Sequence, residues 1–200
     1  MTPRRTPTGA AVLQPEVTRA ITEAVLDELA EAGYGRLSME AVAKRAGVGK
    51  SALYRRWPSK EEMIAAVVAD FSVHRAPSPD TGTLRGDVLA SLQAVYEWIT
   101  HPRFSRILPD LISEAGRNAE IADFARVAIG GPRRDLARVA FTRAIERGEL
   151  PADANLEMAM DLIAGPIYWR LIVRRAEVAE GYLEEVTDLV LRALGAAERG

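Results

Sequence analysis

Apolar residues in this chain recur every three or four positions, which is the spacing of one face of an α-helix. Val17, Ile21, Val25 and Leu29 illustrate this pattern within 16–32. The sequence shows no run of alternating strands and no internal repeat. Helical spacing predicts further helices at 39–46, 50–56, 59–74, 85–100, 103–115, 118–129, 133–147, 155–175 and 180–196. The predicted fold class is therefore all-α.

Residues 45–57 read RAGVGKSALYRRW, and the GVGKS within them matches the end of a phosphate-binding loop. That loop requires G-x-x-x-x-G-K-[ST], so its first glycine would stand at position 44, where the chain has Lys44. The loop must also follow a buried strand, whereas the preceding SMEAVAKRA has helical spacing. These two mismatches argue against a nucleotide-binding loop.

The same residues fit a sharp turn between two short helices. Gly47 can adopt the left-handed backbone conformation that such a turn requires, and Val48 can fill the angle between the helices. Leu53 and Trp57 would face inward. The outward residues would combine cations and hydroxyls that suit DNA phosphates with small residues that permit close approach to the major groove. This outward set is Gly49, Lys50, Ser51, Ala52, Tyr54, Arg55 and Arg56.

The charge of the chain is unevenly distributed. Residues 1–60 hold ten Lys or Arg against six Asp or Glu, a net charge of +4, whereas the rest of the chain has a net charge of −6. Within 41–60 there are six basic residues and no acidic one. This asymmetry indicates an anionic partner for the N-terminal part, with a solvated basic face as the alternative.

Composition narrows the function classes. The chain has no Cys, which excludes disulfides and thiolate chemistry and makes the cytoplasm the default location. His74 and His101 are the two histidines, too few for a His-rich metal site. Residues 1–16 have no apolar stretch of the length that a secretory signal needs, and no apolar run approaches the roughly 18 to 20 residues that cross a bilayer. It also lacks a paired acid/base motif, so an enzyme is not expected.

The run SMEAVAKRAGVGKSALYRRWPSKEEMIAAV resembles the DNA-binding domain of the TetR family of bacterial transcriptional regulators. The matching features are a small capping residue, the A-x-x-A-G-V turn, L-Y-x-x-W in the third helix and S-K-E at the next helix start. The phrases RGEL and GPIYWRL extend the likeness to the C-terminal half. The resemblance implies a flexible basic arm at 1–14, a DNA-binding domain at 15–75 with its helix-turn-helix at 38–57, and an effector-binding and dimerisation domain at 76–200.

The resemblance also implies roles for individual residues. Lys50, Ser51 and Ala52 would contact base edges, with Ala52 small enough to touch a thymine methyl. The chain departs from the commonest family pattern at Gly49, where Ser is frequent, and at Ala52, where Thr is frequent. Both changes remove a hydroxyl, so the operator sequence does not follow from the resemblance.

Phosphate contacts are implied for a second group. Tyr54 and Arg55 would bind phosphates, with Arg56 as a helper, and Ser38 would cap the second helix and offer its amide. Lys60 would bind phosphate at the N-terminus of the fourth helix, where the helix dipole favours an anion. Arg4 and Arg5 resemble the basic arm that some members lay along the minor groove, and a disordered tail is the alternative.

The C-terminal half follows a linker, RAPSPDTGTLRG, at 75–86. The segment 155–173 is apolar on most sides, which predicts burial both against its own core and against a second subunit. One face of the last predicted helix carries Tyr182, Val186, Leu189, Ala193 and Leu194. These two segments resemble the helices through which the family dimerises, so a homodimer through 155–196 is expected.

Aromatic side chains between the linker and the C-terminus are candidates to line an effector cavity, with ordinary core packing as the alternative. Arg170 is either a partner for an acidic effector or a snorkelling or ion-paired side chain. Pro166 is expected to kink its helix beside the cavity. The candidate effector-binding residues are Tyr96, His101, Phe104, Phe124, Tyr168, Trp169 and Arg170.

Together these expectations describe a cytoplasmic bacterial repressor, nucleoid-associated when bound, that dimerises on a palindromic operator and is released by a small molecule. No cofactor, metal or membrane is expected as a partner. A helical interaction module that never binds DNA is the alternative from another class. An activator or a constitutive silencer would be a variant on the same fold.

Overall fold

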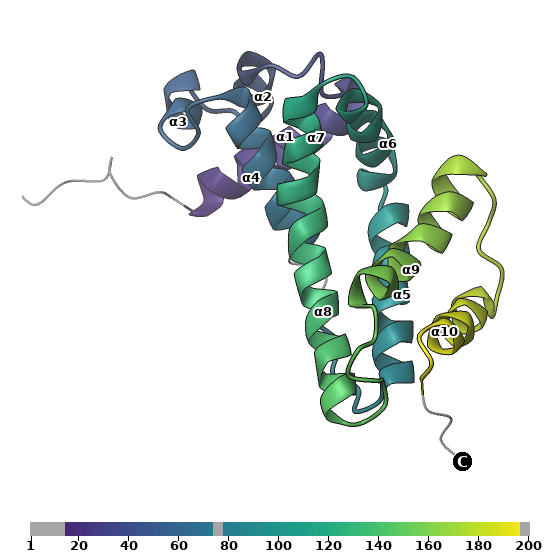
Figure 1. Cartoon of the computed structure of the whole chain (residues 1–200). Helices are drawn as coiled ribbons and strands as arrows, with labels where there is room; N and C mark the ends of the chain where they lie inside the picture. The colour runs from purple at the N-terminus through teal and green to yellow at the C-terminus, as the bar shows by residue number, and fades with distance from the viewer. Residues whose placement is uncertain (1–14, 74–77, 197–200) are drawn as a thin grey trace, which may run out of the picture. The chain divides into compact units, whose positions relative to one another are not determined.

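The computed structural model describes residues 15–73 and 78–196, and all regular structure in these residues is helical (Figure 1). The predicted all-α fold is confirmed. The helices are α1 (Pro15–Ala32), α2 (Met39–Arg45), α3 (Lys50–Tyr54), α4 (Lys60–Val73), α5 (Leu84–Thr100), α6 (Phe104–Ala115), α7 (Ala119–Phe124), η1 (Ala125–Gly130), α8 (Gly131–Glu146), α9 (Leu156–Tyr168), η2 (Trp169–Val173) and α10 (Tyr182–Ala193). The two η segments have the wider turn of a π-helix. The chain divides into two compact units, Met1–Val67 and Val68–Gly200, and the division falls inside α4.

The first unit packs α1, α2, α3 and the first half of α4 around a small apolar core. Ile21, Val25, Val42, Leu53 and Met63 are fully buried in it. Each such side chain contributes about 1.5–3 kcal/mol by leaving water. The helical spacing read from the sequence therefore identifies the faces that build this core.

An ion-pair cluster fastens α2 to α1. Arg45 Nε lies 2.8 Å from Glu28 Oε1 and Arg45 Nη1 lies 3.8 Å from Asp27 Oδ2, while a third contact joins Arg45 to Glu31. The hydrogen bonds that Arg45 donates to Glu31 raise the pKa of Arg45, and the charges of the neighbouring carboxylates act in the same direction. Arg45 therefore stabilises the packing of α2 on α1, although it is one of the six basic residues within 41–60.

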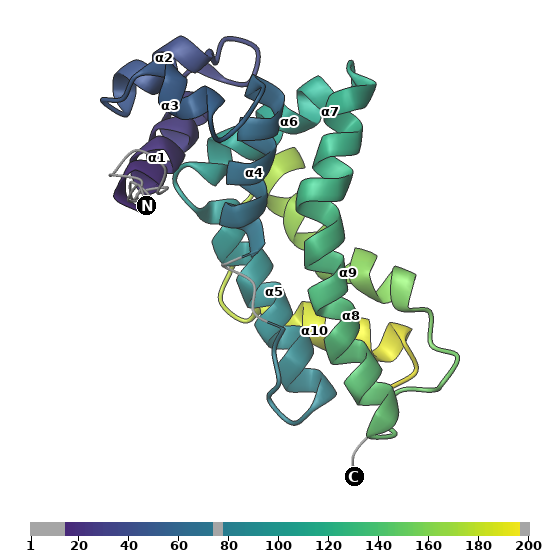
Figure 2. The same cartoon turned by 90° about the vertical axis from the view of Figure 1, so that its left-hand side faces the viewer.

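The second unit is built around α5. This helix contacts α6, α8, α9 and α10, and Figures 1 and 2 show α5 and α8 running side by side. α10 packs on α5 and α9. The helices of this unit therefore form a bundle in which α5 packs against both α8 and α9.

The glycines at 130 and 131, which lie between the predicted helices 118–129 and 133–147, do not interrupt the helical turns. Both adopt right-handed helical angles, with φ of −67° and −55°. Gly131 donates its N–H to Arg126 O, five residues back, so the extra residue is absorbed in the wide turn of η1. Pro132 fits because it stands in the first turn of α8. Helical turns therefore run from Ala119 to Glu146.

The RGEL phrase forms a buried polar cluster at the start of α5. Arg147 Nη2 lies 3.2 Å from Asp87 Oδ2 and 3.1 Å from Glu149 Oε2, and both acids are buried. Asp87 also accepts hydrogen bonds from Thr81, and Glu149 accepts one from the Leu84 N–H at the first turn of α5. The phrase that the resemblance singled out therefore has a structural role.

Candidate functional site

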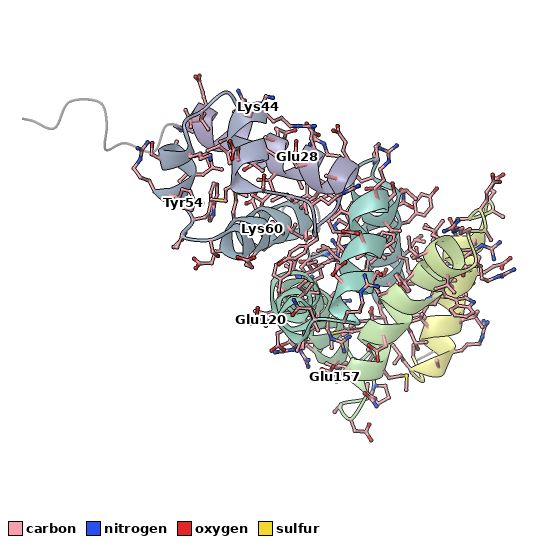
Figure 3. All side chains as sticks on the ribbon, turned by 90° about the horizontal axis from the view of Figure 1, so that it is seen from above. Glu28, Lys44, Tyr54, Lys60, Glu120 and Glu157 are labelled. Atoms are coloured by element: carbon pink, nitrogen blue, oxygen red, sulfur yellow. The ribbon has the colours of Figure 1, made fainter. Side chains whose placement is uncertain are left out.

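The helix-turn-helix presents α3 as an exposed basic helix. Gly47 has φ of +66°, the left-handed conformation predicted for the turn, and Gly49 precedes the first residue of α3. Lys50, Ser51 and Arg55 are exposed, and Tyr54, labelled in Figure 3, is 53% exposed. The turn therefore leaves the hydroxyl and cationic side chains of α3 available to a partner.

Three residues do not face the way that the sequence predicted. Ala52 is only 9% exposed and lies among the buried residues of the unit, so it offers little surface to a thymine methyl. Trp57 is partly exposed rather than buried. Arg56 turns back into the unit, where Nη1 donates to Ala52 O at 2.9 Å and Nε donates to Thr18 Oγ1 at 3.3 Å. Arg56 therefore braces α3 against α1.

Lys50 is paired with an acid on the neighbouring helix. Its Nζ lies 2.8 Å from Glu40 Oε2, and both side chains are exposed. The hydrogen bond to Lys50 lowers the pKa of Glu40, and the hydrogen bond to Glu40 raises the pKa of Lys50. The predicted base-reading cation thus has an acidic neighbour that the sequence reasoning missed. Glu40 stands ten residues earlier and only the turn brings the two together.

Two predicted phosphate ligands make contacts inside the unit. Lys60 Nζ donates to Tyr34 O at 2.8 Å and lies 4.7 Å above the centre of the Tyr34 ring. Figure 3 labels Lys60 on α4. Ser38 caps α2 as expected, because its Oγ accepts the Ala41 N–H at 3.1 Å. Arg4 and Arg5 lie outside the described residues.

The second unit contains a largely apolar cavity of about 260 Å³ bounded by α5, α6, η1, α8 and α9. Its wall is formed by Pro79, Ser91, Ala94, Val95, Trp98, Ile99, Leu108, Ile129, Gly130, Arg133, Arg134, Leu136, Ala137, Met160, Ile163, Ala164 and Tyr168. A small concave site with few polar groups is typical of a small-molecule site.

Of the seven residues predicted to bind an effector, all of them in the described part of the chain, Tyr168 is the one in this wall. Phe104 is fully buried behind it, with its ring centre 4.2 Å from that of Trp98 and 5.5 Å from that of Phe71. His101 packs edge-on against Phe71 at 4.8 Å. These aromatic residues belong to a core cluster that supports the cavity from outside.

Trp169 and Arg170 lie outside the cavity wall. Trp169 is exposed, and Arg170 Nε donates to Glu177 O at 2.7 Å while its guanidinium lies 4.4 Å over the Tyr182 ring. Arg170 therefore holds the loop between η2 and α10. Phe124 and Tyr96 are partly buried but are not in the cavity wall.

The cavity wall contains Arg133, a cation that the sequence did not identify as a candidate. Its guanidinium lies 4.3 Å over the Trp98 ring, and Nη1 donates to Ser72 O at 3.0 Å and Nη2 to Ala94 O at 3.5 Å. Burial lowers the pKa of Arg133 to about 10, so it stays protonated at neutral pH. The adjacent Arg134 is neutralised by Asp161 at 2.7 Å and by Glu157.

No group of His, Cys, Asp or Glu among the described residues is arranged to hold a metal ion. The helices of residues 15–73 and 78–196 are all too short or too polar to cross a membrane.

Two family models match the chain. One, described as bacterial regulatory proteins of the tetR family, matches residues 21–67, and the other, described as a tetracyclin repressor-like C-terminal domain, matches residues 78–190. Together they cover the helix-turn-helix and the cavity-bearing bundle.

Curated proteins and solved structures are similar over nearly the whole chain. The uncharacterised HTH-type transcriptional regulator YdeS of Bacillus subtilis is 31% identical over 175 residues, which are 88% of this chain and 86% of YdeS. The DNA-binding transcriptional repressor TetR of Mycobacteroides abscessus is 28% identical over 88% of this chain and 92% of its own. The crystal structure of the TetR family transcription regulator SCO0332 is 32% identical, with a TM-score of 0.67, and covers 92% of this chain and 100% of its own.

Proposed function

The chain belongs to the TetR family of bacterial regulatory proteins and is a DNA-binding transcriptional regulator, and we propose that it is a repressor released from its operator by a small molecule. The DNA-binding function resides in the helix-turn-helix of the first unit. We further propose that it represses transcription, that its effector binds in the cavity and that α4 couples the cavity to the helix-turn-helix.

Lys50 and Ser51 are the proposed base-reading residues, and Tyr54 and Arg55 the proposed phosphate ligands. All four are exposed on or beside α3, which supports this assignment. Cations and hydroxyls at such positions contact base edges and phosphate oxygens. Ala52 is left out because it is buried. Arg56 and Lys60 are proposed to position the reading helix and α4, respectively, because their side chains are held inside the unit.

The protein is proposed to act as a homodimer through α9, η2 and α10. Trp169, Val173 and Leu189 are 59%, 49% and 58% exposed in the single chain, although they are large and apolar. A set of exposed apolar residues on adjoining helices is typical of a subunit interface. A two-fold dimer would present two reading helices to half-sites about 34–36 Å apart.

The observation that carries the release mechanism is the double attachment of the last turn of α4 to the cavity wall. Arg133, in the wall, donates to Ser72 O, and Trp98, also in the wall, contacts Phe104, which stacks on Phe71. Phe71 and Ser72 are in the last turn of α4, and the first half of that helix belongs to the DNA-binding unit.

A ligand that displaces Arg133 or Trp98 would therefore act on α4 directly. The mechanism is a population shift: the ligand binds more tightly to a conformer in which the end of α4 has moved. Its differential affinity for the two conformers sets how far DNA affinity falls, about tenfold for each 1.4 kcal/mol.

The experiment begins with selection of genomic fragments that the purified full chain binds, followed by fluorescence anisotropy over a salt series. We expect specific, salt-dependent binding. Arg55→Ala should weaken binding to all fragments alike, whereas Lys50→Ala should also change the ranking of operator variants. Arg117→Ala, an exposed arginine of the second unit, is the control. Absence of binding at low salt would favour the interaction-module alternative.

Release and sense of regulation are tested with a reporter behind the selected operator. Repression in cells, lifted by a compound that binds the purified chain, supports the proposal. Activation would reverse its sense, and constant repression with every bound compound would make the protein a constitutive silencer. Phe104→Leu should reduce the coupling of compound to DNA, because it breaks the ring contacts between Trp98 and Phe71 but keeps an apolar side chain in the core.

A further inference from the structure

The cavity of the second unit holds a positive charge with no acid to neutralise it among the described residues. Arg133 lies in a wall that is otherwise mainly Ala, Val, Ile, Leu, Met and Trp. Its hydrogen-bond acceptors are the carbonyl oxygens of Ser72 and Ala94. Carbonyls satisfy N–H groups but do not cancel a charge, and withdrawing even part of a charge from water without a counter-ion has a cost.

The guanidinium also has unused donors. Arginine carries five N–H groups, and the two contacts to Ser72 and Ala94 leave three without an acceptor in the described part of the chain. Trp98, on which the guanidinium rests, adds another donor. Its Nε1 is buried and has no hydrogen-bond partner among the described residues. A buried unpaired donor beside a partly buried cation favours an acceptor that arrives from outside.

We propose that the cavity binds a small apolar monoanion, a carboxylate on a hydrocarbon body, with Arg133 as its counter-charge. This inference rests on the proposed function, in which the cavity is the effector site. A carboxylate matches the planar fork of a guanidinium, and the apolar wall accommodates the hydrocarbon.

The charge count favours a monoanion over a phosphate dianion. Arg134 is the other cation in the wall, and Asp161 and Glu157 already neutralise it. A dianion would therefore leave one uncompensated negative charge in an apolar cavity, at a cost of several kcal/mol. The lowered pKa of Arg133, with burial as its cause, agrees with a cation that lacks a counter-ion.

The size of the cavity limits the hydrocarbon. Its volume of about 260 Å³ lies below the roughly 300 Å³ at which typical small-molecule sites begin. Suitable probes are therefore octanoate and 2-naphthoate. Their amides, octanamide and 2-naphthamide, have nearly the same shape without the charge.

The test is calorimetric titration of the purified full chain at pH 7.5 with these two acids and their amides. We expect at least one acid to bind at least tenfold more tightly than its own amide. In Arg133→Met the preference should fall to less than threefold, and Arg133→Lys should keep part of it because the charge remains without the fork. Arg138→Met changes an exposed arginine of the same helix, outside the cavity wall, and should leave the preference intact.

Equal affinity for acid and amide, failure of both acids to bind, or a preference that survives in a folded Arg133→Met would overturn the inference. If Arg133→Met does not fold, the Lys variant decides, because an unchanged preference and unchanged acid affinity would exclude a fork-shaped contact. The same titrations with operator DNA present separate the two proposals. Acids that bind through Arg133 without lowering DNA affinity would leave the ligand assignment standing and overturn release.

Discussion

Lys50 and Glu40 form an ion pair across the helix-turn-helix, with Nζ 2.8 Å from Oε2. Lys50 is the first residue of α3 and Glu40 lies in the first turn of α2. Because Lys50 lowers the pKa of Glu40, the acid stays charged at neutral pH and keeps its charge to lower pH than a free glutamate. If Lys50 contacts DNA as proposed, Glu40 competes with DNA for Lys50 and repels phosphates.

Glu40→Gln should raise affinity for non-specific duplex DNA by about 3- to 10-fold at low salt, because it frees Lys50 and removes a negative charge from the reading face. Fluorescence anisotropy over a salt series measures this change. Glu16→Gln removes the same charge from an exposed position on α1 and should have a smaller effect. Reduced affinity in Glu40→Gln would mean that Glu40 instead holds Lys50 in its DNA-binding position.

Gly47→Ala should lower the free energy of unfolding by about 1–2 kcal/mol, the cost of a left-handed backbone for a residue with a Cβ. The φ of Gly47 is +66°, and nothing lies within 4 Å of the added Cβ, so the cost is purely conformational. Gly35→Ala has equal space without a positive φ and should be neutral or stabilising by about 0.4–1 kcal/mol. Denaturant titration compares the two, and equal stability would contradict the role assigned to the turn.

The helices, the turn and the cap at Ser38 were accessible from the sequence because each depends on neighbours within a few residues. The cavity was not, because its wall depends on which side of each helix faces another helix. Tyr96 and Trp98 show this: they are two positions apart on α5, so they point to different sides, and Trp98 is the one in the wall. Arg133 sits in the polar run GPRRDLAR, where nothing local distinguishes a buried arginine from an exposed one.

Asp87→Asn should lower the free energy of unfolding by about 2–4 kcal/mol, because it removes the buried carboxylate that pairs with Arg147 and accepts two hydrogen bonds from Thr81. Asp188→Asn breaks an exposed pair with Arg85 at 3.1 Å and should change stability by less than about 0.5 kcal/mol. Thermal and denaturant unfolding measure both variants. Equal effects would show that the RGEL cluster is not a structural centre.

Trp169→Glu and Leu189→Glu should each convert the proposed dimer to monomer at micromolar concentration, since a charge would be buried in an apolar interface. The matched control is Val127→Glu, because Val127 is 60% exposed but lies on η1, which is not one of the proposed interface helices. Sedimentation velocity gives the oligomeric state. Monomeric wild type, or dimers in both interface variants, would overturn the assignment of α9, η2 and α10.

Arg133→Met should leave the unliganded protein as stable as the wild type or more stable, by up to about 3 kcal/mol. That upper value is the cost implied by lowering the pKa of Arg133 from its ordinary value to about 10. The expected gain in stability has this sign because the pKa of Arg133 is lower in the folded state than in the unfolded state. The charged form is penalised at every pH below about 10, and the penalty disappears as pH rises from there towards the unfolded pKa.

The stability difference between Arg133→Met and the wild type should therefore be constant from pH 6 to 9 and shrink above pH 10. Urea titrations across this range provide the measurement, with Arg138→Met as the exposed control on the same helix. A loss of more than about 2 kcal/mol in Arg133→Met would mean that the contacts to Ser72 O and Ala94 O outweigh the burial cost. In that case Arg133 stabilises the packing of α4, α5 and α8, and its charge does not serve to bind a ligand.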